Sequence, residues 1–194
     1  MSTPKPPPNV VFCGGGTVGS GFLQHLVALR DAGRCRLAGV LPSHLSEERE
    51  PLLAGLVAAH AVPLLSSLDD LLAIADLDLV LSAGNHKRFG AVHIRKARRG
   101  IINFHAAPLP RYRGSACPAF AILNNEISFG VTFHLIVDED LDAGPILYVE
   151  HFPIGQNDTA GDIDRRCIEV GISAFIRCAE QILGGDAGNN CPHC

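Results

Sequence analysis

The side chains best suited to catalysis lie in one short segment, residues 103–114. Asn103 and His105 are two positions apart, so on an extended chain an amide donor and a proton acceptor point to the same side. The prolines that follow His105 fix the backbone and prevent a helix, which holds the pair in a set orientation. An acidic turn at 138–145 supplies a third polar group. Taken alone, this set is compatible with a hydrolase, a transferase or a purely structural role.

A sheet must position this segment. Apolar strand-like runs alternate with helical patterns over the first hundred residues, which predicts an α/β fold with a doubly wound, mostly parallel sheet covered on both faces. A second helix is expected to start at Ser46 with an acidic first turn. Ligands of such sheets bind at the carboxyl edge, where Asn103 and His105 lie. The expected strands are 9–13, 36–41, 63–65, 77–82 and 101–104, with a short helix at 68–75.

The second half of the chain has a different rhythm. Two strand-like runs, 130–137 and 146–152, resemble an antiparallel pair. A final helix follows, with apolar positions at helical spacing from Ile168 to Leu183, and it is expected to end at Gly184-Gly185. His134, alone on the first of these runs, is interpreted as a core or supporting residue and not as part of the site.

A glycine-rich turn, Gly14-Gly15-Gly16-Thr17-Val18-Gly19, follows the first strand and matches a dinucleotide-binding fingerprint. A nicotinamide or flavin site usually has an acidic residue about 20 positions on. No carboxylate lies between Asp31 and Glu47. The alternatives are an NAD-binding Rossmann-like domain, a seat for an anionic group of an acceptor at Gly14 and Gly15, or glycines that only allow close packing.

Three ordered motifs resemble the folate-dependent formyltransferase family, which includes methionyl-tRNA, glycinamide ribonucleotide, sugar-nucleotide and peptide-synthetase formyltransferases. The resemblance covers about residues 9–155. It rests on Asn103-x-His105 with the run Pro-Leu-Pro-Arg-Tyr-Arg-Gly, on Gly-Val-Thr-Phe-His at 130–134, and on Leu-Asp-Ala-Gly-Pro-Ile-Leu at 141–147. One departure is Ala107, where many members have a serine, and this variant looks more like the sugar and peptide-synthetase branches.

The resemblance implies a Rossmann-like formyltransferase fold, the co-substrate 10-formyltetrahydrofolate and no metal. It implies that Asn103, His105 and Asp142 are catalytic: Asn103 would stabilise the oxyanion of a tetrahedral intermediate, His105 would transfer protons and Asp142 would pair with His105. A pterin slot would lie between segment 85–90 and the backbone of 137–141, and Tyr112 and Arg113 are candidates for acceptor binding. The expected cofactor-binding residues are Arg88, Phe89, Gly90, Leu109, Val137, Asp138 and Leu141.

Composition bounds the partners. The 194 residues carry a formal net charge of -4, which argues against general nucleic-acid binding. Methionyl-tRNA members have a further carboxyl-terminal domain, so we expect a small-molecule or carrier-bound amine and not tRNA. Glycinamide ribonucleotide, and a non-catalytic binding domain, stay open as alternatives, as does the oligomeric state.

The organisation expected along the chain is a disordered proline-rich leader at 1–8, a catalytic domain at 9–185 and a flexible tail at 186–194. The chain has no apolar run long enough to cross a membrane and no secretion signal at its start. We therefore expect a cytoplasmic protein. A basic cluster at 87–99 is either a solvated helix face or a landing site for an acidic partner, and the tail run Cys-Pro-His-Cys at 191–194 is either frayed or metal-binding.

Overall fold

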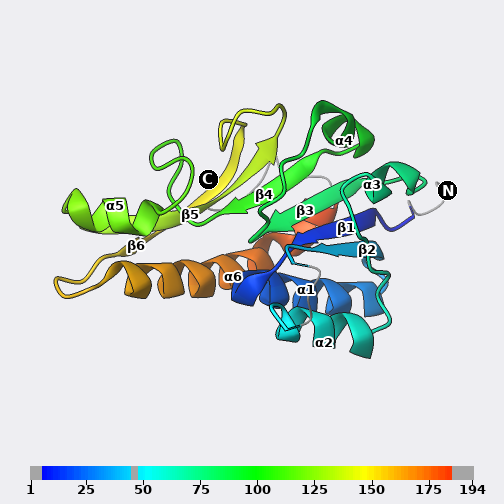
Figure 1. The fold of residues 1–194 in the computed structure, drawn as a ribbon, viewed down its shortest axis with the longest axis horizontal. Helices are drawn as coiled ribbons and strands as arrows, with labels where there is room; N and C mark the ends of the chain where they lie inside the picture. The colour runs from blue at the N-terminus through cyan, green and yellow to red at the C-terminus, as the bar shows by residue number, and fades with distance from the viewer. Residues whose placement is uncertain (1–5, 45–47, 185–194) are drawn as a thin grey trace.

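The computed structural model describes residues 6–44 and 48–184. Its centre is a six-stranded sheet in the order β2-β1-β3-β4-β5-β6 (Figure 1). The first four of these strands are parallel, whereas β4–β5 and β5–β6 are antiparallel. The doubly wound α/β fold with an antiparallel pair is thereby confirmed. The strands are β1 (Asn9–Gly14), β2 (Arg36–Pro42), β3 (Leu79–Ala83), β4 (Ile101–His105), β5 (Ser128–Ile136) and β6 (Ile146–Pro153).

Helices cover both faces of the sheet. The longest two, on the same face, are α1 (Gly16–Asp31) and α6 (Ala160–Gly184), and α3 and α4 lie on the opposite face (Figure 1). Along β1, Val10 and Phe12 belong to the core beneath α1 and α6, while Val11 and Cys13 belong to the core on the α3 side. Both faces are therefore buried, as a central parallel strand requires. The remaining helices are α2 (Pro51–Ala59), α3 (Asp70–Ala73), α4 (Ala91–Lys96) and α5 (Cys117–Leu123).

Stacked aromatic rings hold α6 against α1. The rings of Phe22 and Phe175 are parallel with centroids 4.2 Å apart, and Phe104 of β4 meets the Phe22 ring edge-on at 5.5 Å. These three fully or nearly fully buried side chains fix the strand that carries Asn103 and His105 onto the helical layer.

The structure corrects two local predictions. Residues 63–65 do not form a strand, because only an isolated bridge joins Leu64 to Val40. Helix α2 begins at Pro51 and not at Ser46. Proline fits the first helical position, since its missing N–H would be unpaired there in any case.

Several expectations concern the ends of the chain. Residues 1–5 of the predicted leader, Ser46 itself, Gly185 and the tail with its cysteines lie outside the described residues. Residues 6–8 precede β1 without regular structure. Among the described helices, none combines the length and apolarity needed to span a bilayer.

Candidate active site

Strand register aligns three polar side chains across the middle of the sheet. Ser82 of β3 is paired with Asn103 of β4, which is paired in turn with His134 of β5. Directly paired residues of neighbouring strands project from the same face. Accordingly, the Ser82 hydroxyl donates to Asn103 Oδ1 at 2.8 Å, and Asn103 Nδ2 lies 3.1 Å from His134 Nε2. The Asn103 amide is therefore held at both ends.

The tautomer of His134 follows from its other contact. His134 Nδ1 lies 3.1 Å from the carbonyl oxygen of Leu135, which only accepts hydrogen bonds, so Nδ1 carries the proton. In the neutral ring, Nε2 is then the acceptor for one Nδ2 hydrogen of Asn103. The second Nδ2 hydrogen has no partner among the described residues, and Asn103 lines a cavity. An amide with one free hydrogen facing a cavity is suited to donate to an oxyanion.

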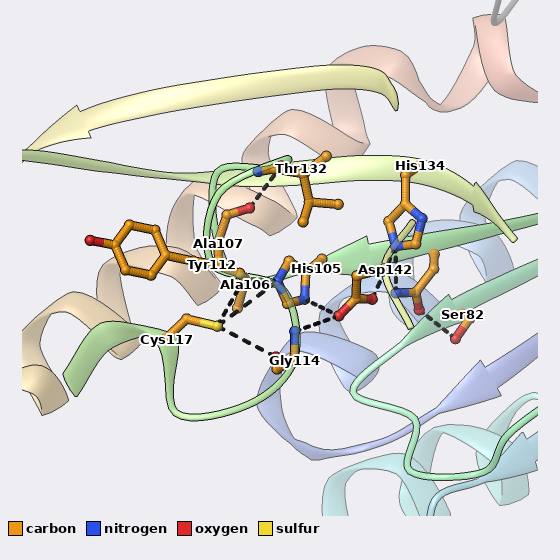
Figure 2. A network of polar contacts seen from close by, with 12 residues as sticks. Ser82, His105, Ala106, Ala107, Tyr112, Gly114, Cys117, Thr132, His134 and Asp142 are labelled. Atoms are coloured by element: carbon orange, nitrogen blue, oxygen red, sulfur yellow. Dashed lines mark hydrogen bonds and ion pairs between the residues drawn. The ribbon is translucent and has the colours of Figure 1, made fainter. Parts of the chain in front are cut away.

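Asp142 reaches this cluster from the loop between β5 and β6. Its φ of 49° is in the left-handed region, which aspartate tolerates better than most residues. Two positions on, a Cβ at Gly144 would lie 1.9 Å from the Leu135 carbonyl oxygen, so this loop passes directly against β5. Asp142 Oδ2 lies 3.4 Å from His105 Nδ1 and accepts a hydrogen bond from the Gly114 amide at 3.0 Å (Figure 2).

His105 is buried and has a defined orientation. Its Nε2 lies 2.8 Å from the carbonyl oxygen of Tyr112 and therefore carries a proton. The Cys117 thiol donates to the same carbonyl at 3.0 Å. In the neutral ring, Nδ1 is thus the nitrogen with a free lone pair, and it faces Asp142. Proton uptake at Nδ1 would create an imidazolium next to a carboxylate.

The environment of Asp142 favours its ionised form. Burial opposes ionisation, but this effect is outweighed by the contact with His134, the backbone hydrogen bond from Gly114 and the electrostatic influence of His105, which together hold the pKa of Asp142 below its ordinary value of 3.8. The second oxygen, Oδ1, is 3.4 Å from His134 Nε2. Asp142 is therefore an anion at neutral pH that touches both histidines.

The loop after His105 is anchored by Thr132. This residue is the strand partner of His105 and is fully buried. Its hydroxyl donates to the Ala107 carbonyl at 2.7 Å and accepts from the Leu109 amide at 3.0 Å. Figure 2 shows how these contacts bring the loop back over β5. Ala107 is fully buried. Because it is an alanine and not a serine, it presents no hydroxyl at this position.

A cavity of about 850 Å³ lies at this carboxyl edge. Such a volume is within the range of small-molecule sites. Among the predicted site residues, those that line it are Gly15, Arg88, Phe89, Asn103, His105, Asp138, Leu141 and Asp142. Those that do not line it are Gly14, Gly90, Leu109, Tyr112, Arg113 and Val137.

Tyr112 illustrates the second group. Its hydroxyl donates to Glu126 at 2.6 Å and its ring packs near Phe129, so its side chain is engaged away from the cavity while its carbonyl oxygen orients His105.

The two walls predicted for a pterin are adjacent. Arg88 donates to the Glu139 carbonyl at 3.3 Å, and the Ala91 amide donates to the Glu139 carboxylate at 3.1 Å. Segments 85–90 and 137–141 thus face each other across one end of the cavity. Apolar side chains of Phe89 and Leu141 line this end.

Sequence reasoning missed Ser82 and Glu50, and it left His134 outside the site as a core or supporting residue. For Ser82 and His134, the pairing of neighbouring strands was the available signal. Glu50 is 6% exposed, and its Oε2 accepts a hydrogen bond of 2.7 Å from the Gly16 amide in the glycine-rich turn. No pattern in the sequence points to that contact.

Much of the basic cluster at 87–99 is engaged in structural contacts. Lys87 donates to the Pro42 and Ser43 carbonyls, and Arg98 pairs with Asp76 and Asp78. Neither of these two residues lies on α4, which spans Ala91–Lys96, although the Arg98 side chain is exposed. Within residues 6–44 and 48–184, no group of three or more His, Cys, Asp or Glu side chains is arranged to hold a metal ion.

Two curated relatives are formyltransferases. A methionyl-tRNA formyltransferase of Moorella thermoacetica is 40% identical over 89 residues, 46% of this chain and 28% of that protein. A GDP-perosamine N-formyltransferase of Brucella melitensis is 32% identical over 114 residues, 59% of this chain and 42% of that protein. The chain thus spans less than half the length of these relatives.

Solved structures share the fold. A glycinamide ribonucleotide transformylase of Symbiobacterium toebii superposes with a TM-score of 0.78 at 19% identity, covering 92% of this chain and 88% of that one. An N-formyltransferase of Helicobacter canadensis, in complex with folinic acid and dTDP-3-aminofucose, gives 0.72 at 20% identity, covering 92% and 65%. The family model described as formyl transferase matches residues 43–179, and this chain therefore belongs to the formyl transferase family.

Proposed function

We propose that this chain transfers a formyl group from 10-formyltetrahydrofolate to the amine of a small-molecule or carrier-bound acceptor. The observation that carries the proposal is the meeting of Asn103, His105 and Asp142 at one wall of the cavity. Asn103 and His105 come from one strand and Asp142 from a distant loop, so a chance cluster is a poor explanation. The Asn103 amide is also pre-oriented by two hydrogen bonds.

The cavity suits a folate donor. Its volume of about 850 Å³ accommodates a drug-sized molecule, and the apolar side chains of Phe89 and Leu141 offer contacts for a flat heterocycle. Arg88 and Asp138 add charged groups at the same end. The Helicobacter canadensis structure described above contains folinic acid, a formylated folate.

Asn103 supplies the electrophilic assistance. When the acceptor amine attacks the formyl carbon, a new C–N bond forms and the carbonyl oxygen becomes an oxyanion. The free Nδ2 hydrogen of Asn103 donates to that oxygen, and such a donor contributes about 3 kcal/mol to transition-state stability. Ser82 and His134 keep the amide from rotating as the charge develops.

His105 and Asp142 handle the protons. The attacking amine loses a proton, which His105 Nδ1 accepts, and Asp142 at 3.4 Å balances the resulting imidazolium. His105 then returns a proton to the folate nitrogen as its bond to the formyl carbon breaks. The products are an N-formyl amine and tetrahydrofolate, so atoms and charge balance without an added oxidant or reductant.

The matched proteins guide the choice of acceptor. They include enzymes named for methionyl-tRNA, GDP-perosamine and glycinamide ribonucleotide. The negative net charge of this chain disfavours a large polyanion such as tRNA. Amino sugars on nucleotides and amines on carriers remain the candidates that we favour.

A panel of amines tests the proposal. The protein is mixed with 10-formyltetrahydrofolate and each amine, including aminoacylated initiator tRNA, and products are scored by mass for one added formyl group. We expect a formylated product from the parent and from the His151→Ala control, an exposed histidine outside the cavity, and a loss of at least about a hundredfold with His105→Ala. Equal rates for His105→Ala and the parent would refute the catalytic assignment.

A further inference from the structure

The glycine-rich turn at the start of α1 is already filled by the chain itself. Glu50 is the residue that precedes α2, and α2 packs against α1. Its Oε2 accepts the hydrogen bond from the Gly16 amide at 2.7 Å, and its side chain is among the few charged ones that are nearly fully buried. A carboxylate thus occupies the place where a helix N-terminus would hold an anion.

The Glu50 carboxylate packs directly against the glycine-rich turn. A Cβ added to Gly15 would lie 2.1 Å from Glu50 Oε1, so the carboxylate rests directly on the Gly15 backbone. Two further amides of the turn have backbone partners: that of Gly15 donates to the Ala83 carbonyl at 3.1 Å, and that of Gly19 donates to the Gly15 carbonyl at 3.1 Å. A phosphate placed on the Gly16 amide would have to displace Glu50, and it would meet a like charge while doing so.

This end of the cavity is still open to ligands. Gly15, Gly16 and Glu50 all line it, together with the exposed side chain of Arg49. An acceptor bound near His105 therefore extends toward the turn within the same cavity. The carboxylate is placed to contact whatever part of the acceptor arrives there.

We infer that Glu50 determines acceptor specificity: it excludes acceptors that would seat a phosphate monoester on the glycine-rich turn, and so selects amines without one at that end. This inference rests on the proposed function for its catalytic consequence. Its binding consequence is independent of any activity. Glu50→Ala should open the turn to phosphate monoesters, and Glu50→Gln, which keeps the shape and removes the charge, should open it partly.

Binding is measured by titrating ribose 5-phosphate into ¹⁵N-labelled protein and following the Gly16 amide resonance. We expect saturable shifts of this resonance in Glu50→Ala, smaller ones in Glu50→Gln, and none in the parent. The matched control Glu48→Ala removes an exposed carboxylate that does not line the cavity, and it should behave like the parent. If the parent binds the phosphate at Gly16 as tightly as the variants do, the inference is wrong; a folded Glu50→Gln variant with an unshifted Gly16 amide also overturns it.

Catalysis gives the second readout. Glycinamide ribonucleotide and its dephosphorylated nucleoside form a pair that differs only in the phosphate. The ratio of their kcat/KM values should rise by about tenfold or more from the parent to Glu50→Ala, since a hydrogen bond to a charged group becomes available. An unchanged ratio counts against the inference. If no amine is formylated by the parent, the proposed function fails, while the Gly16 titration still decides whether Glu50 excludes phosphate.

Discussion

The Ser82→Ala substitution gives the sharpest test of how the active-site amide is oriented. The Ser82 hydroxyl has one described contact, its 2.8 Å bond to Asn103 Oδ1. Removing it leaves the amide held by His134 alone. One neutral hydrogen bond is worth about 1 kcal/mol, so we expect kcat to fall by about fivefold, with little change in KM for either substrate.

This loss of kcat should act through Asn103. Asn103→Ala alone should lower kcat by about a hundredfold or more. In that background, Ser82→Ala should have almost no further effect, because the group that it orients is gone. Steady-state rates for the parent, both single variants and the double variant complete the cycle.

A matched control separates orientation from general damage. Ser20 is also a buried serine, and its hydroxyl has no hydrogen-bond partner within the described part of the chain. Ser20→Ala should leave kcat unchanged and should not lower the midpoint of thermal unfolding. If the Ser82 and Asn103 effects multiply in the double variant, the orienting role of Ser82 is refuted.

Three further predictions concern the other half of the cluster. His134→Ala should reduce kcat by about tenfold, because Asn103 loses its second anchor, and the loss should shrink in the Asn103→Ala background; a fully multiplicative loss would count against it. Because the pKa of Asp142 is depressed in the folded state, its contribution to stability is present above pH 3.8 and fades as the pH falls below that value. The difference in urea-unfolding free energy between the parent and Asp142→Asn should therefore become smaller below pH 3.8. A difference that stays constant with pH would contradict the depressed pKa. Gly144→Ala places a Cβ 1.9 Å from the Leu135 carbonyl, so it should displace the loop and lower both the unfolding midpoint and kcat, whereas unchanged values of both would show that the loop does not need this close approach.

The sheet and the central pair of the site were accessible from sequence for a physical reason. Buried parallel strands are apolar on both faces, which marks them in the sequence. The spacing of Asn103 and His105 then gives their common direction, because side chains alternate along a strand. The structure bears out this geometry at the carboxyl edge of β4.

Contacts between distant segments were less accessible. Asp142 was assigned through the family resemblance, and its approach to His105 depends on the left-handed backbone at Asp142 and on the close passage at Gly144. His134 was interpreted as a supporting residue, and it does support Asn103, but its contact with Asp142 appears only when the loop is folded.

The charge pattern near the second helix gave a wrong prediction, because a tertiary contact uses one of the acidic residues. The acidic residues after position 46 favoured an early start of the second helix, but α2 begins at Pro51. The carboxylate of Glu50 is used by a different helix, α1, through the Gly16 amide. Charge near a helix terminus in sequence therefore does not reveal which helix the charge serves.

The most direct test of the central claim is formyl transfer by His105→Ala. With ¹³C-formyl 10-formyltetrahydrofolate and the best acceptor of the panel, single-turnover rates are compared between the parent and this variant by NMR detection of the labelled product. We expect the rate to fall by at least about a hundredfold in a variant that unfolds at nearly the parental temperature. A folded His105→Ala variant whose rate stays within about threefold of the parent would contradict this expectation, because such a change corresponds to less than about 1.4 kcal/mol of activation free energy.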